Sequence, residues 1–212
     1  TLYDALSGDS TLEDIVETGP DGVKLLAGGS GLVEMMNIDS AARYQLIRNV
    51  DTIADNTDIL ITDAPAGASD SALAFVAASQ RVVVVVVAEP TSFMDAYAVI
   101  KAAHFEHKLQ NFSIVINMAK DGAEALKSFE KFRDIAMRFL DVNLTFVGHV
   151  PFSAPMRQSV VQRKPLLATN SNTPEKELLA FKSLSQKILK CPMNTYDGIR
   201  FFGNNSVLKE IV

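Results

Sequence analysis

The sequence predicts an α/β fold, in which a mostly parallel β-sheet carries helices on both of its faces. Two observations lead to this prediction: apolar, β-branched segments recur along the chain, and segments with apolar residues at helical spacing lie between them. The clearest strand is 82–87, a run of valines that would crowd a helix but suits a strand buried on both faces. The composition agrees, because 48% of the 212 residues are hydrophobic and 21% are charged, as in ordinary globular proteins.

Weaker signals predict the other elements. Further strands are expected at 23–27, 58–63, 112–118 and 144–150. Helices are expected at 40–49, at 175–190 with Pro174 at the first position, and in two regions with apolar residues at helical spacing. The apolar residues of the first region are Met94, Ala98, Ile100 and Phe105. Those of the second region are Phe129, Phe132, Ala136, Phe139 and Leu140. The predicted N-caps are Thr11, Thr91, Asp121 and Thr173.

The chain is expected to form one body, residues 1–190, followed by a tail, residues 191–212. The tail begins where proline, glycine and asparagine interrupt the pattern, and it ends in a short amphipathic helix. The apolar residues of that helix are Val207, Leu208, Ile211 and Val212. Because Lys209 is its only basic residue, we expect it to dock on the body, with weak membrane contact as the alternative.

Composition and charge exclude several classes of protein. A formal net charge of −5 argues against direct nucleic-acid binding. Cys191 is the single cysteine, which rules out an intrachain disulfide and a cysteine-built zinc site and suits a reducing cytosol. The sequence shows neither a spanning apolar run nor a signal peptide, so a cytoplasmic location is expected. The chain begins with Thr1 inside a helical pattern, and we expect its natural amino terminus to lie further upstream.

The ends of three predicted strands carry the candidate site. Asp63 ends one strand and is followed by Gly67, Asn117 ends another, and Pro151 and Phe152 follow the last. Ligands of open α/β sheets bind at the carboxyl ends of the strands. A carboxylate there suits Mg²⁺ beside phosphates, a glycine lets a backbone N–H approach a phosphate, and an asparagine amide matches a purine edge. Taken singly, Asp63 is also compatible with a helix cap or a turn, and Asn117 with a turn.

The region that begins DILITDAPAG at Asp58 and runs into EPTSFMDAYAVIK resembles the Walker B and switch II region of the ParA/MinD ATPases. With the tail sequence GIRFF, it is most similar to the FlhG (FleN) proteins, which control flagellar number and placement. The resemblance implies that Asp63 is the Walker B aspartate, which holds Mg²⁺ through water, and that Gly67 is the switch II glycine. It further implies that Asn117 recognises adenine and that Pro151 and Phe152 flank the base. Ser153 departs from the aspartate that the family often carries in that loop.

The phosphate loop that should accompany these residues is absent from the sequence. No G-x-x-x-x-G-K-[ST] occurs, and AGGSGLVE, residues 27–34, lacks the lysine and the magnesium ligand, so it is interpreted as a structural turn. The predicted fold is therefore a MinD-like P-loop NTPase without its first strand–loop–helix unit, and no ATPase activity is expected of this chain. The missing strand should leave an unpaired edge and exposed apolar surface beside residues 59–63.

For the complete protein, the resemblance implies ATP and Mg²⁺ as cofactors, an ATP-dependent homodimer and slow hydrolysis that resets a switch. It implies an FlhF-like GTPase, flagellar switch proteins or a transcriptional activator as partners. Besides the cytoplasm, it implies a peripheral position at the inner face of the membrane. Two alternatives stay open: a non-catalytic interaction protein on the same scaffold, and a dinucleotide-dependent α/β enzyme, against which the missing glycine fingerprint argues.

The histidines are interpreted without catalytic roles. His104 and His107 share a helix face, but no third metal ligand is evident, so surface positions are expected. His149, near the predicted base-binding edge, is expected to serve packing.

Overall fold

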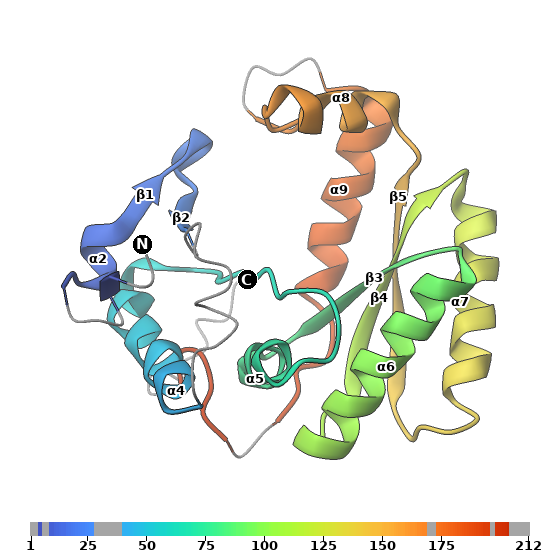
Figure 1. The fold of residues 1–212 in the computed structure, drawn as a ribbon. Coiled ribbons are helices and arrows are strands. Elements are labelled where there is room, and N and C mark those ends of the chain that lie inside the picture. Colours follow the sequence, from blue (N-terminus) through green and yellow to red (C-terminus); the bar gives the residue numbers. More distant parts are fainter. Residues whose placement is uncertain (1–3, 6–8, 28–39, 169–172, 196–197, 204–212) are drawn as a thin grey trace. The chain divides into compact units, whose positions relative to one another are not determined.

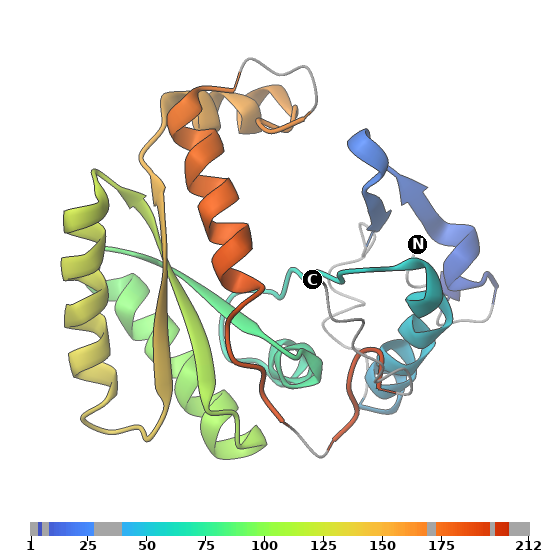
Figure 2. The ribbon, with the colours of Figure 1, turned by 180° about the vertical axis from the view of Figure 1, so that it is seen from behind.

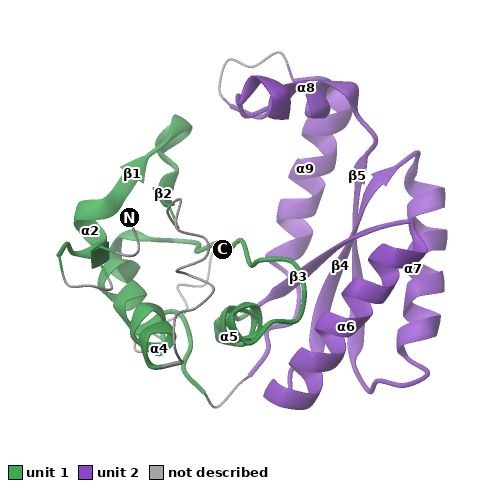
Figure 3. Ribbon diagram, viewed as in Figure 1, with its two compact units in different colours: residues 1–80, 196–212 green, residues 81–195 purple. Residues whose placement is uncertain are grey.

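The computed structural model describes residues 4–5, 9–27, 40–168, 173–195 and 198–203. The chain divides into two compact units, one of residues 1–80 with 196–212 and one of residues 81–195 (Figure 3). No helix among the described residues is long and apolar enough to cross a membrane.

The second unit confirms the predicted fold class. Its parallel sheet has the order β3-β4-β5, with bounds Val82–Val87, Asn111–Ala119 and Asn143–Pro151. Helices α6 (Pro90–His107) and α7 (Gly122–Ala136) connect the strands, and α8 (Ala154–Gln162) and α9 (Glu175–Ile188) follow β5. Figures 1 and 2 show α6 and α7 on one face of the sheet and α9 on the other. This is the layered α/β arrangement that alternating strands and helices favour.

The valine strand β3 has the predicted bounds but not the predicted burial. Val82 and Val86 are buried, whereas Val83 is 37% exposed and Val85 is 58% exposed. The expectation that both faces are covered was wrong because α6 packs against β3 on one face, while on the other face α9 packs against β5. The central strand β4 is buried from Phe112 to Ile116.

Helix boundaries differ from the predictions by one or two residues where proline is involved. Helix α6 begins at Pro90 and its N-cap is Glu89, not Thr91, because proline suits the first helical position. Helix α9 begins at Glu175 and its N-cap is Pro174, not Thr173, whereas its end, Ile188, precedes the predicted one. Asp121 caps α7 as predicted, and its side chain accepts a hydrogen bond from the Glu124 N–H.

Two of the predicted apolar stripes are only partly buried. In α6 the buried residues are Ala96, Ile100 and Ala103, whereas Met94 is 72% exposed and Phe105 is 52% exposed. In the second stripe only Phe139 is exposed, since α7 ends at Ala136 and Phe139 lies beyond it. The other members, Phe129, Phe132, Ala136 and Leu140, are buried.

A cluster of asparagines holds the amino end of β4. The buried Asn194 accepts hydrogen bonds at Oδ1 from the backbone N–H groups of Gln110 (3.1 Å) and Asn111 (2.9 Å), and its Nδ2 donates to the Asn111 carbonyl (2.9 Å). The Asn143 side chain donates to Asn111 Oδ1 at 3.1 Å. Asn194 thereby joins the segment after α9 to the start of the central strand.

Strand β5 contains an irregularity at Gly148, where its register against β4 shifts. Gly148 has φ +142°, and a Cβ placed there would lie 3.0 Å from Leu184 Cδ2 of α9. Both the backbone conformation and the close approach of α9 therefore favour glycine.

Replacing Gly148 with alanine is expected to lower the free energy of unfolding by about 1–3 kcal/mol, because the added methyl group pushes against Leu184 and the backbone is strained. Urea unfolding followed by far-UV circular dichroism measures the change. The matched control is Gly122→Ala, at the start of α7, where a Cβ meets only His149 Cε1 at 3.6 Å. The control should change stability by about 0.5 kcal/mol or less; equal losses in both variants would contradict the explanation.

The first unit begins with a short helix and an antiparallel hairpin. Its elements are α2 (Leu12–Ile15), β1 (Val16–Thr18), η1 (Pro20–Gly22), β2 (Lys24–Leu26), α4 (Ser40–Asn49), η2 (Val50–Asn56) and α5 (Asp70–Ala78). Thr11 and Asp14 form the predicted capping box of α2. The strand predicted at 23–27 exists as β2, but it pairs antiparallel with β1 and so belongs to a hairpin, not to the parallel sheet.

The core of the first unit gathers residues distant in sequence. Leu12, Ile47, Val50, Ala78 and Phe201 are buried together. The Phe201 N–H donates to the Ala78 carbonyl at 3.1 Å, and its ring stacks on Phe75 with centroids 6.3 Å apart. Residues 198–203 therefore pack in the first unit.

Two sequence predictions fall largely outside the described residues. Of the turn at 27–34, only Ala27 is described, and the amphipathic helix of the tail lies wholly beyond residue 203.

Candidate functional site

Three of the predicted site residues meet at the carboxyl edge of the parallel sheet. Asn117 of β4 is in register with Val87 of β3, and Ala119 is in register with Pro151 of β5. The Phe152 N–H donates to the Ala119 carbonyl at 2.9 Å. The parallel register therefore brings Asn117, Pro151 and Phe152 to one edge, as the sequence predicted.

The side chain of Asn117 is half-buried and held in place locally. Its Oδ1 accepts a hydrogen bond from the Met118 N–H at 2.9 Å, and Met118 adopts the left-handed conformation with φ +58°. The amide nitrogen of Asn117 is therefore the group best suited to donate to a ligand, since the oxygen already accepts one bond.

Pro151 is buried at the end of β5, and Phe152 is 64% exposed. The next residue, Ser153, caps α8 through a hydrogen bond from the Met156 N–H to its Oγ at 3.2 Å. The serine that departs from the family's aspartate thus has a structural role as a helix cap. An exposed aromatic ring at this edge can stack on the face of a planar base.

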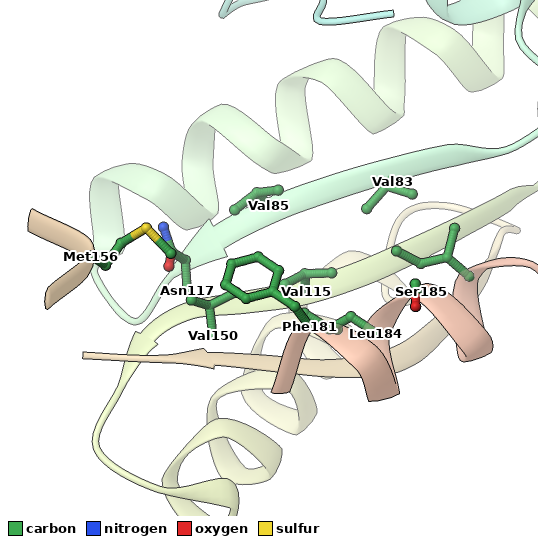
Figure 4. A pocket seen from close by; sticks show the side chains of 10 residues that line it. Val83, Val85, Val115, Asn117, Val150, Met156, Phe181, Leu184 and Ser185 are labelled. Atoms are coloured by element: carbon green, nitrogen blue, oxygen red, sulfur yellow. The ribbon is translucent and has the colours of Figure 1, made fainter. Parts of the chain in front are cut away.

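A groove of about 450 Å³ runs from this edge along the sheet, between the strands and α9. Figure 4 shows Asn117 at one end, with Val85, Val115, Val150 and Phe181 along the walls. Its lining is almost entirely hydrocarbon. Sequence reasoning missed this groove, although Phe181, Leu184 and Ile188 recur at helical spacing and indicate the face that α9 turns toward the sheet.

Asp63 and Gly67 lie in the first unit, in a segment without helix or strand. The strand predicted at 58–63 was wrong, because no described strand pairs with this segment and a strand needs a neighbour for its backbone groups. Ile59 is 54% exposed and Ile61 is 87% exposed, which confirms the predicted exposure of apolar surface there. Asp63 is exposed as well.

Gly67 adopts φ +94°, the left-handed region that favours glycine, and a Cβ there would meet nothing within 4 Å. Glycine is therefore required by the backbone conformation and not by crowding. Two residues later Ser69 caps α5 by accepting a hydrogen bond from the Ala72 N–H at 3.3 Å.

Two titratable groups at opposite ends of the parallel sheet have structural partners, Asp121 beyond the carboxyl end of β4 and His104 beside its amino end. Donation from the Glu124 N–H is the main cause that holds the pKa of Asp121 below its usual value, with smaller contributions that include the charges of Lys120 and His149. His104 Nδ1 lies 2.9 Å from the Leu109 carbonyl just beyond α6. Within the described ranges, no group of three histidine, cysteine or acidic side chains could hold a metal ion.

The residues present fit the base of a nucleotide better than its phosphates and Mg²⁺. The edge formed by Asn117, Pro151 and Phe152 offers an amide donor and an exposed ring, which suits a purine base. Asp63 supplies one exposed carboxylate, which suffices for Mg²⁺ only where phosphates and waters provide the remaining ligands. The 212 residues contain no lysine-bearing phosphate loop.

Comparison with known proteins identifies the family. The family model described as ParA, NUBPL iron-transfer P-loop NTPase, matches residues 36–189. The chain belongs to the ParA family of P-loop NTPases. The predicted resemblance to the ParA/MinD proteins is thereby confirmed at the level of the family.

Relatives within the ParA family include flagellar proteins. Antiactivator FleN of Pseudomonas aeruginosa is 35% identical over 204 residues, which cover 95% of this chain and 72% of FleN. Flagellum site-determining protein YlxH of Helicobacter pylori is 27% identical over 166 residues, covering 78% of this chain and 56% of YlxH. The cell division ATPase MinD of Pyrococcus furiosus shares the fold, with a TM-score of 0.62 and 21% identity over 90% of this chain and 75% of that one.

Proposed function

We propose that this chain is the Walker B and base-binding portion of a MinD/FlhG-type ATP switch that regulates flagellar number and placement. The observation that carries the proposal is the 35% identity to FleN over 95% of the chain. The name of YlxH, a flagellum site-determining protein, supports the same role. Residues 1–190 would form the incomplete nucleotide-binding body and 191–212 the tail.

The proposed roles follow the geometry within each unit. Asn117 would donate its amide proton to a ring nitrogen of adenine, and Phe152 would cover the face of the base beside Pro151. Asp63 would accept a hydrogen bond from a water on Mg²⁺, and the Gly67 N–H would approach a phosphate. When bound, ATP supplies the charge and the cleavable bond that distinguish the two states of a nucleotide switch.

The proposed partners are those of a flagellar regulator. They include a second copy in an ATP-bound homodimer, an FlhF-like GTPase, flagellar switch proteins and a transcriptional activator. The name antiactivator, which FleN carries, favours the transcriptional activator. Peripheral membrane contact through residues 191–212 is part of the same proposal.

The chain of 212 residues is expected to show no ATP turnover of its own, because it contains no phosphate loop to hold the β- and γ-phosphates. Phosphate release from ATP and Mg²⁺ should be the same for the wild type and for Asp63→Asn. Magnesium-dependent turnover in the wild type that Asp63→Asn abolishes would contradict this expectation.

The switch role can be tested in cells that lack their own FleN-type protein. The chain, fused behind a phosphate-loop unit of the ParA family, is expected to restore the normal number of flagella counted by electron microscopy. The matched control carries Asp63→Asn in the same fusion and should fail, because the carboxylate is needed for Mg²⁺. Equal restoration by both fusions would support the non-catalytic scaffold and refute the switch.

A further inference from the structure

One peptide group at the carboxyl end of β4 is held from both sides. It joins Ala119 to Lys120, and its carbonyl accepts a hydrogen bond from the Phe152 N–H at 2.9 Å. Its N–H donates to Glu124 Oε2 of α7 at 2.6 Å. The C=O and N–H of a trans peptide group point in opposite directions, so this group lies between Glu124 on one side and Phe152 on the other.

The hydrogen bond from the Lys120 N–H to Glu124 is charge-assisted. A carboxylate acceptor makes a hydrogen bond shorter and stronger than a neutral acceptor does, and 2.6 Å is short for an N–H···O bond. An acceptor on the N–H of a peptide group also polarises its carbonyl and strengthens the bond that this carbonyl accepts. The Glu124 carboxylate therefore fixes the plane of the peptide group and strengthens its bond to the Phe152 N–H.

The ring of Phe152 takes its direction from its backbone. It is 64% exposed, so packing holds it only in part. Pro151 before it pairs with Ala119, and Ser153 after it caps α8. The Phe152 N–H between them is held by the Ala119 carbonyl, whose orientation Glu124 fixes.

We infer that Glu124 is a positioning residue of the base-binding edge, and that it acts on Phe152 through the peptide group of Ala119 and Lys120. The inference rests on the proposed function, in which Phe152 covers the face of adenine and Asn117 donates to its edge. The carboxylate of Glu124 is already bonded to the Lys120 N–H, so its role is to orient the ring and not to bind the base.

A capping role of Glu124 in α7 is separable from this positioning role. The Glu124 backbone N–H donates to the Asp121 side chain at 2.9 Å, and this bond does not need the carboxylate. The variant Glu124→Ala keeps the backbone N–H, and alanine is the strongest helix former. Glu124→Ala therefore removes the bond to the Lys120 N–H and leaves the start of α7 capped.

Adenosine is the probe, because it carries the base without phosphates and so needs no phosphate loop. Titration of the 212-residue chain with adenosine from about 0.1 to 10 mM covers the dissociation constants expected of a small ligand. The NMR signals of the Phe152 ring and the Asn117 side-chain amide report binding. Glu124→Ala is expected to raise the Kd about three- to tenfold, the effect of losing one hydrogen bond. Glu124→Gln keeps a neutral acceptor and should lie between Glu124→Ala and the wild type.

The matched control is Glu130→Ala, which removes another exposed carboxylate of α7 and should leave the Kd unchanged. In a chain that carries Phe152→Ala, adding Glu124→Ala should change the Kd by less than about twofold, because the ring on which Glu124 acts is gone. A general structural effect would weaken binding in both backgrounds. Circular dichroism verifies that each variant folds, and Glu124→Gln carries the test if Glu124→Ala does not.

Two results would overturn the inference while leaving the proposed base site in place. They are equal adenosine affinities of the wild type, Glu124→Ala and Glu130→Ala, and an effect of Glu124→Ala that is the same with and without the Phe152 ring. A wild-type chain whose Phe152 and Asn117 signals do not respond to adenosine would overturn the proposed base site, and the inference with it.

Discussion

Replacing Phe132 with alanine is expected to lower the free energy of unfolding by about 3–5 kcal/mol, the largest loss expected of a single side chain here. Phe132 lies in α7, is fully buried, and its ring contacts that of Phe93 of α6 with centroids 5.5 Å apart. Its removal leaves a cavity where α6 and α7 meet above the sheet. Urea unfolding followed by far-UV circular dichroism measures the loss.

The matched control is Phe139→Ala, a few residues along the same segment, since Phe139 is 70% exposed. The control should change the free energy of unfolding by about 0.5 kcal/mol or less. The helical pattern alone predicts equal burial for both phenylalanines. A loss at Phe139 as large as that at Phe132 would therefore show that the segment after α7 packs differently from the structure described.

Replacing Asn194 with alanine is expected to cost about 2–4 kcal/mol, because two backbone N–H groups and one carbonyl at the start of β4 lose their partners together. The side chain is 5% exposed, so water replaces these bonds only in part. Hydrogen exchange should accelerate at the amides of Gln110 and Asn111, which donate to Asn194 Oδ1.

Two further variants separate the contributions of this side chain. Asn194→Asp keeps the acceptor for both N–H groups but loses the donor to the Asn111 carbonyl, so an intermediate loss of stability is expected. Asn143→Ala removes one exposed side-chain bond and should have little effect. Unchanged exchange at Gln110 and Asn111 in Asn194→Ala would contradict the proposed role.

Local signals predicted the strands of the parallel sheet well. Six valines in succession, and the apolar segments around Phe112 and Val147, specify strands because their side chains favour extended backbone and need burial. Asp121 was predictable as a cap because it precedes a helical pattern and its side chain bonds to a backbone N–H three residues later. The meeting of Asn117 with Pro151 and Phe152 followed from the parallel order of the strands.

The misassigned elements depend on distant partners. Residues 58–63 have the composition of a strand, but no strand in the described part of the chain pairs with them, and residues 24–26 pair within a hairpin. Met94 has the spacing of a buried residue and yet faces solvent, since the sheet contacts the side of α6 that carries Ala96 and Ile100. The spacing of apolar residues indicates that a helix has an apolar face, but it does not indicate which of those residues contact the sheet.

The sequence by itself determined the family, the order of the strands and helices in the second unit, and the residues at the carboxyl ends of β4 and β5, because these depend on side chains close together in the chain. Only the tertiary structure decided that Val83 and Val85 are exposed, that Asn194 holds β4, and that α9 leaves an apolar groove beside Asn117. The physical reason is that burial and hydrogen-bond partners are properties of pairs of elements, and the pairs meet only when the chain folds.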